Sequence, residues 1–181
     1  MFVFFVYRQS KYTTIRSAKE LQAGDHVSWP TEAMSGMFQH HAIVVAHKGE
    51  NHFRIIHVIQ EGESSISGSA FSRSKSSKSS KSSSTSSDSS PSVRQVVETQ
   101  CDLSEKISKK DVRRYDHDPH HCYEPAEVIV RARSMMGLYD YHVLENNCEH
   151  FARWCKTGKK VANQGRVAKK IPPLNKVAGS V

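Results

Sequence analysis

The chain has 181 residues, of which 37% are hydrophobic, and it carries a formal net charge of +8 with a pI near 9.4. This length is enough for one domain with a buried core, and the low hydrophobic share indicates that part of the chain stays outside that core. The positive charge favours an anionic partner surface, such as phospholipid headgroups or nucleic acid. Four well-separated cysteines argue against a disulfide framework or a two-pair zinc site and indicate a reducing compartment; they are Cys101, Cys122, Cys148 and Cys155.

The first residues form a short apolar run, from Phe2 to Tyr7. No basic region precedes this run and no small-residue cleavage site follows it, so it does not resemble a signal peptide. A membrane-spanning helix needs about 20 apolar residues, and no stretch of the sequence reaches that length. We therefore expect a cytoplasmic protein, monomeric, that contacts membranes only peripherally.

A serine-rich stretch interrupts the middle of the chain. Residues 63–92 contain little besides serine and lysine, a composition that buries nothing and predicts a disordered insertion. The basic, proline-containing residues 159–181 predict a flexible tail. We expect an N-terminal segment over residues 1–19 and a catalytic domain over residues 20–158.

Strand patterns come first in this domain. Residues 40–47 and 52–59 are rich in β-branched side chains and are separated by Lys48-Gly49-Glu50-Asn51, which predicts a β-hairpin. Residues 93–99 predict a third strand. A helix is then expected from Pro125 to the glycine at 137, with a buried stripe formed by Val128, Ile129, Ala132, Met135 and Met136.

A second helix is predicted to begin at Cys148. Asn147 suits the N-cap position, Phe151 and Cys155 continue an apolar stripe, and Gly158 marks the end. Strands followed by helices predict an α+β fold with a compact, mainly antiparallel sheet.

Cys148 has two readings. It is a buried thiol that packs like a small hydrophobe, or it is a nucleophile whose pKa is lowered by the helix N-terminus and a nearby histidine. His150 lies off the apolar stripe and is expected to face solvent or a loop, whereas Glu149 suits the helix dipole.

The hairpin register selects two of the eleven histidines as partners for the thiol. If the turn is symmetric about Gly49 and Glu50, His57 lies opposite Ala42 and becomes the diagonal neighbour of His40, while His41 falls on the other face. A one-residue slip would separate His40 from His57. Two adjacent imidazoles on an apolar face suit thiol acyl transfer, in which one ring accepts the sulfur proton and a second orients the first.

These residues resemble the lecithin:retinol acyltransferase family over roughly residues 20–158, apart from the serine-rich insertion. The resemblance rests on four segments, which are Asn147-Cys148-Glu149-His150-Phe151, His40-His41-Ala42-Ile43, Ile56-His57 and Gly24-Asp25-His26-Val27. It implies a circularly permuted papain-like fold in which Cys148 is the nucleophile, His40 the general base and acid, and His57 the residue that orients His40.

The resemblance also implies a chemistry. A cysteine-dependent acyltransferase or phospholipase of A1/A2 type would move an acyl chain from a phospholipid onto Cys148 as a thioester, then to an amine, an alcohol, a lysolipid or water. It would need no cofactor and no metal. Many family members end in a hydrophobic membrane anchor, whereas residues 159–181 are polar and basic.

Alternatives remain open. A cysteine peptidase or amidase would use the same three residues, and a non-catalytic lipid-binding module would keep the fold without the reaction. His117, His120, His121 and Cys122 are soft zinc ligands, but they lack paired knuckle spacing. Nucleic-acid binding is disfavoured because no recognition motif accompanies the charge.

Overall fold

The computed structural model describes residues 11–31, 38–60, 94–142 and 145–162. The expected serine-rich insertion, the apolar run at residues 2–7 and residues 163–181 of the expected tail lie outside these ranges. Within them the strands are β1 (Tyr12–Thr14), β2 (His26–Pro30), β3 (Gln39–Gly49), β4 (His52–Gln60), β5 (Arg94–Asp102), β6 (Arg113–Tyr115) and β7 (Gly137–Tyr139). The helices are α1 (Ser104–Ser108), α2 (Pro125–Ser134) and α3 (Cys148–Thr157), with 3-10 turns η1 (Ala18–Glu20) and η3 (Pro119–His121).

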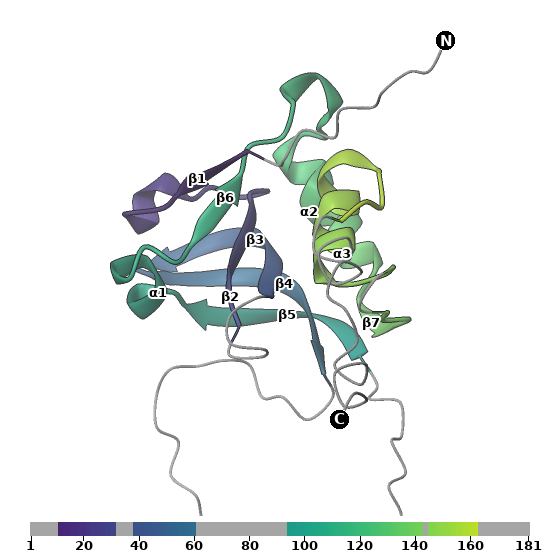
Figure 1. Cartoon of the computed structure of the whole chain (residues 1–181), viewed down its shortest axis with the longest axis horizontal. Coiled ribbons are helices and arrows are strands. Elements are labelled where there is room, and N and C mark those ends of the chain that lie inside the picture. The colour runs from purple at the N-terminus through teal and green to yellow at the C-terminus, as the bar shows by residue number, and fades with distance from the viewer. Residues whose placement is uncertain (1–10, 32–37, 61–93, 143–144, 163–181) are drawn as a thin grey trace, which may run out of the picture.

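The strands form one sheet in the order β1-β6-β2-β3-β4-β5-β7, and every neighbouring pair is antiparallel. Helices α2 and α3 lie together on one side of this sheet (Figure 1). An antiparallel sheet combined with a few helices confirms the expected α+β class.

The β3–β4 hairpin has the expected register where it bears on the histidines. Ala42 pairs with His57, and Val44 pairs with Ile55. Nearer the turn, irregularities between Val44 and Ala46 and between His47 and Gly49 shift the register. The turn itself pairs Gly49 with His52, so it lies one residue later in the chain than predicted. Each irregularity adds one residue to β3 and shifts the register by one, and the two shifts together bring Ala42 opposite His57 as predicted.

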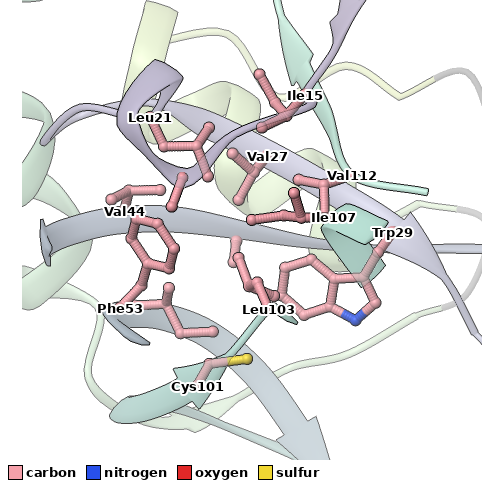
Figure 2. Close-up of a cluster of buried hydrophobic side chains, with 13 residues drawn as sticks. Ile15, Leu21, Val27, Trp29, Val44, Phe53, Cys101, Leu103, Ile107 and Val112 are labelled. Carbon is pink, nitrogen blue, oxygen red and sulfur yellow. The ribbon is translucent and has the colours of Figure 1, made fainter. Parts of the chain in front are cut away.

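Two hydrophobic clusters occupy opposite faces of β3 and β4. The far-side cluster (Figure 2) contains Ile15, Ala18, Leu21, Val27, Trp29, Ala42, Val44, Phe53, Ile55, Cys101, Leu103, Ile107 and Val112. The helix-side cluster contains Ile43, Val45, Ile56, Val58, Val96, Val128, Ala132, Tyr139, Cys148, Phe151, Ala152 and Cys155. Side chains alternate along a strand, so Ala42 and Ile43 serve different clusters.

Helix α2 begins at Pro125 as predicted and buries Val128 and Ala132 fully. Ile129 and Met135 pack partly against the helix-side cluster, but Met136 is 50% exposed. The prediction for Met136 was wrong because the helix ends at Ser134, so the 3.6-residue periodicity no longer governs the following side chains. In the described ranges, the helices are all too short or too polar to span a bilayer.

Candidate active site

Helix α3 begins and ends as the sequence predicts. The Asn147 side chain accepts hydrogen bonds from the amides of Glu149 (3.0 Å) and His150 (3.2 Å), and the Asn147 amide donates to His150 Nδ1 (3.2 Å). Gly158 closes the helix in the left-handed conformation, with φ of 73°. His150 is 7% exposed, so the expectation that it faces solvent was wrong. Its ring turns back to cap the helix, and the spacing of apolar residues along a helix does not predict such a contact.

The Cys148 thiol lies where β3 and β4 separate. The β3–β4 ladder begins at Ala42 and His57, so residues of β3 before Ala42 lack a ladder partner in β4. Sγ donates to the Gln39 carbonyl oxygen at 3.7 Å and accepts from the His41 amide. The sulfur therefore contacts backbone atoms on both sides of His40.

The resting thiol is neutral. Burial raises the pKa of Cys148 to about 11, although hydrogen bonds from backbone amides, including that of His41, act in the opposite direction. The pKa was expected to be lowered by the helix N-terminus and a histidine. Here the cost of burying a thiolate at a side chain that is 7% exposed exceeds the gain from nearby amide dipoles. A reaction at this sulfur must remove its proton as the bond to sulfur forms.

His40 and His57 form a pair on the far side of the hairpin. His40 Nε2 lies 2.8 Å from His57 Nδ1, and His57 Nε2 lies 3.0 Å from Thr99 Oγ1. Burial lowers the pKa of His57 to about 4. Burial, followed by the neighbouring His57, lowers the pKa of His40 well below 6.5. Both rings are therefore neutral near pH 7, which is the protonation state that a general base requires.

The three expected site residues thus meet at one place on the sheet but from two sides. Strand alternation places the His40 and His57 rings with the far-side cluster, where Trp29 lies 5.1 Å from His40 between ring centroids. Cys148 packs in the helix-side cluster. Within the part of the chain that the structure describes, no hydrogen bond joins the thiol to the His40 imidazole.

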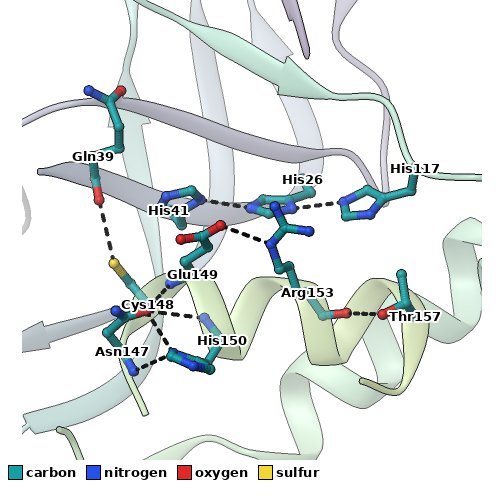
Figure 3. Close-up of polar contacts among 10 residues, drawn as sticks. All are labelled: His26, Gln39, His41, His117, Asn147, Cys148, Glu149, His150, Arg153 and Thr157. Atoms are coloured by element: carbon teal, nitrogen blue, oxygen red, sulfur yellow. Dashed lines mark hydrogen bonds and ion pairs between the residues drawn. The ribbon is translucent and has the colours of Figure 1, made fainter. Parts of the chain in front are cut away.

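Three further histidines form a chain on the helix side. His41 Nδ1 lies 2.8 Å from His26 Nε2, and His26 Nδ1 lies 2.9 Å from His117 Nε2. Figure 3 shows the three rings in a row beside α3, near Cys148 and the Glu149–Arg153 ion pair. His26 and His41 have no exposed surface, whereas His117 is partly exposed.

Sequence reasoning did not find this row of three histidines. His26 belongs to β2, His41 to β3, and His117 follows β6, so only the sheet order brings them together. One signal was available: His26 lies in an alternating segment, His26-Val27-Ser28-Trp29, that fits a strand, and His41 was already assigned to the second face.

A buried ion pair joins the first turn of α3 to the second. Arg153 Nε donates to Glu149 Oε1 at 2.9 Å, and the two side chains are 10% and 2% exposed. The acidic residue was expected to act through the helix dipole, and its buried salt bridge is an additional role. Because both charges are desolvated, removal of either partner leaves the other unpaired at substantial cost.

The zinc hypothesis receives no support from the geometry. His117 is occupied by His26, and His121 Nδ1 lies 2.9 Å from Asp118 Oδ2 at the surface. Among the described residues, no cluster of three or more His, Cys, Asp or Glu side chains has the geometry to hold a metal ion.

Comparison with known proteins supplies the family. The family model described as lecithin retinol acyltransferase matches residues 19–161, most of the chain and all of the site. The chain belongs to the lecithin retinol acyltransferase family. Lecithin retinol acyltransferases of Mus musculus and Rattus norvegicus are each 45% identical to it over 38 residues, and that of Bos taurus is 42% identical over 38 residues.

The matched stretch covers 21% of this chain and only 16% of each of these relatives. No solved structure matches the chain. Membership of the lecithin retinol acyltransferase family supports an acyltransferase type of function in general terms.

Proposed function

We propose that the chain is a cysteine-dependent acyltransferase or hydrolase that takes an acyl group from a phospholipid. Cys148 forms the thioester, and the acyl group then passes to an amine, an alcohol, a lysolipid or water. The observation that supports this most strongly is the placement of a thiol at the start of α3, in contact with the backbone on both sides of a histidine that is paired with a second histidine.

The first half-reaction uses His40 as the base. His40 accepts the thiol proton while the Cys148 sulfur bonds to the ester carbonyl carbon, and His57 holds the His40 ring in one orientation. No described hydrogen bond joins the thiol to His40 at rest, so the His40 ring must shift toward the sulfur for this step. Its Nε2 keeps the contact with His57 Nδ1 while its Nδ1 accepts the proton. The proton then moves from His40 to the departing lysolipid oxygen as the tetrahedral intermediate breaks down. The products are a neutral imidazole, a lysolipid and an S-acyl cysteine.

Three backbone amides are candidate donors to the negative charge of the tetrahedral intermediate. The amides of His41, Glu149 and Cys148 hydrogen bond to the sulfur and already lower the pKa of its thiol. Amides fixed in a β-strand and at a helix start need little reorganisation to stabilise a developing oxyanion.

The basic charge of the chain fits an anionic membrane as the source of substrate. Each Lys or Arg near such a surface contributes about 1 kcal/mol of attraction, and the chain has a formal charge of +8. Peripheral membrane contact, a cytoplasmic location and a permuted papain-like arrangement of the fold are parts of this proposal.

The test is incubation of the full chain with vesicles of phosphatidylcholine and phosphatidylethanolamine, followed by mass spectrometry of the intact protein and of the lipid products. We expect one acyl group on Cys148, released by hydroxylamine and absent from Cys148→Ser. The matched control is Cys122→Ser, which removes a half-buried thiol next to the opposite end of α3 from Cys148 and should acylate normally.

Three results would contradict the proposal. Acylation at the other cysteines alone would remove Cys148 from its role. Acylation by an activated peptide but not by phospholipid would indicate the peptidase or amidase alternative. No acylation by either class of donor in folded protein would indicate a non-catalytic module.

A further inference from the structure

We propose that the His41–His26–His117 imidazole chain is a proton relay that connects the acyl-enzyme site to solvent and serves the second half-reaction. This inference rests on the proposed function, because it assigns a task to residues beside Cys148 that the His40–His57 pair does not perform. It concerns the step in which an acceptor, water above all, attacks the thioester.

The geometry is that of a continuous hydrogen-bonded path. The two ring-to-ring distances are 2.8 Å and 2.9 Å, and the path begins at two rings with no exposed surface and ends at the partly exposed His117. In a neutral imidazole, one ring nitrogen donates and the other accepts. Three such rings can therefore align with every shared proton pointing the same way.

The inner end of the path has an unused nitrogen. His41 Nε2 is buried and has no hydrogen-bond partner among the residues that the structure describes. An unpaired buried polar atom is costly, so it points to a partner that arrives during function. His41 is also the residue whose amide contacts the Cys148 sulfur, and strand alternation places its ring on the helix side with that thiol.

The relay balances as follows. The acceptor oxygen bonds to the thioester carbonyl carbon while its proton passes to His41 Nε2. The Nδ1 proton of His41 passes to His26 Nε2, the Nδ1 proton of His26 passes to His117 Nε2, and the Nδ1 proton of His117 passes to solvent. The sulfur leaves as a thiolate and recovers its proton from solvent, because His40 is neutral after the first half-reaction. Reverse transfer, or rotation of the rings, restores the starting tautomers.

Burial favours this mode of transfer over storage of charge. Burial is the largest cause that disfavours a charged ring at His26 and at His41; the neighbouring imidazoles come next at His26, and cationic side chains act at both. The cations that face them include Arg153 of α3. A relay in which each ring gains one proton as it loses another leaves no lasting charge in the interior. Ester hydrolysis releases a proton when the fatty acid ionises, so an enzyme with a buried site needs an exit for it.

The test separates the two half-reactions in the full chain with a chromogenic acyl ester presented in phospholipid vesicles. The burst reports acyl-enzyme formation, and the steady state reports deacylation. Two variants interrupt the relay, the interior His26→Phe and the partly exposed His117→Ala. We expect both to keep the burst rate and to slow deacylation by at least about tenfold, since positioned proton transfer contributes 10²–10⁴-fold. Added imidazole should restore His117→Ala but not His26→Phe.

The control is His120→Ala. His120 is exposed and lies in the same loop, and no described hydrogen bond joins its ring to His41, His26 or His117. It should match the parent in burst and steady state. If His26→Phe does not fold, His117→Ala and its rescue by imidazole decide the matter alone. Normal deacylation in a folded His117→Ala variant would overturn the proposed relay but would not contradict the proposed thioester mechanism. Absence of any acyl group on Cys148 in the parent protein, by mass spectrometry of the intact chain after mixing with the ester, would instead overturn the proposed function.

Discussion

The buried histidines predict that the folded state loses stability in mild acid, and His57 allows the size of the effect to be worked out. Its pKa is about 4 in the folded chain, against 6.5 for an unperturbed histidine. Between these values the unfolded chain binds a proton that the folded chain refuses, so stability rises with pH in this window. His57 therefore costs the folded state no stability above pH 6.5, and this cost grows until the pH falls to about 4.

The magnitude follows from the size of the shift. A difference of about 2.5 pKa units, at 1.36 kcal/mol per unit, corresponds to about 3 kcal/mol. His57 is 2% exposed, so little solvent screening reduces this value. His26, His40 and His41 act in the same direction, because burial lowers the pKa of each one.

The assay is urea unfolding of the parent and of His57→Gln at several pH values from 7 to 4. Glutamine can hydrogen bond but does not titrate in this range. We expect the free energy of unfolding of the variant to fall by about 3 kcal/mol less than that of the parent across the window. The exposed His120→Gln should reproduce the slope of the parent. Parallel curves for the parent and His57→Gln would refute the reasoning, because they would mean that the ring titrates alike in both states.

Three further predictions concern local structure. Gly24→Ala should destabilise the fold severely, because φ is +82° and the new Cβ would lie 2.7 Å from a backbone atom of α2. Gly49→Ala should cost only backbone strain, because φ is +123° but no atom lies within 4 Å of the new Cβ. Thermal unfolding of the two variants tests the difference. Asn147→Ala removes the cap of α3 and should cost about 1 kcal/mol in chemical denaturation; an unchanged midpoint would contradict the cap. Iodoacetamide at neutral pH should label half-buried Cys122 before Cys148 in the resting protein, as peptide mapping would show, since burial holds the Cys148 pKa near 11.

The features predicted well from sequence are those that local chemistry decides. The cap, the apolar stripe and the terminal glycine of α3 lie within 12 consecutive positions, from Asn147 to Gly158, and the structure contains all three. The hairpin register near His57 agrees with the prediction, but only because two extra residues in β3 compensate for a turn that lies one residue later than expected.

The features that were missed depend on long-range packing. Strands β1, β6 and β7 have three residues each, too few for a periodic signal, and are fixed by pairing with distant strands. His117 looked like part of a polar loop, and only the pairing of β6 with β2 brings it to His26. The pKa of Cys148 was misjudged because burial depends on how two helices and a sheet close around it. The domain limits and the roles of His40, His57 and Cys148 stay predictions.

Because Gln60 pairs with Arg94, the stability of the domain depends little on how many residues connect them. Gln60 is the last residue of β4 and Arg94 the first of β5, and because they pair in the ladder the two ends of the connection are fixed side by side. The entropic cost of joining two fixed ends grows only with the logarithm of the length of the connection, and doubling the length costs only about 0.6 kcal/mol. Insertions or deletions at this point are therefore nearly neutral for the fold, and natural selection can alter the number of serines and lysines there without disturbing the strands that hold the histidines.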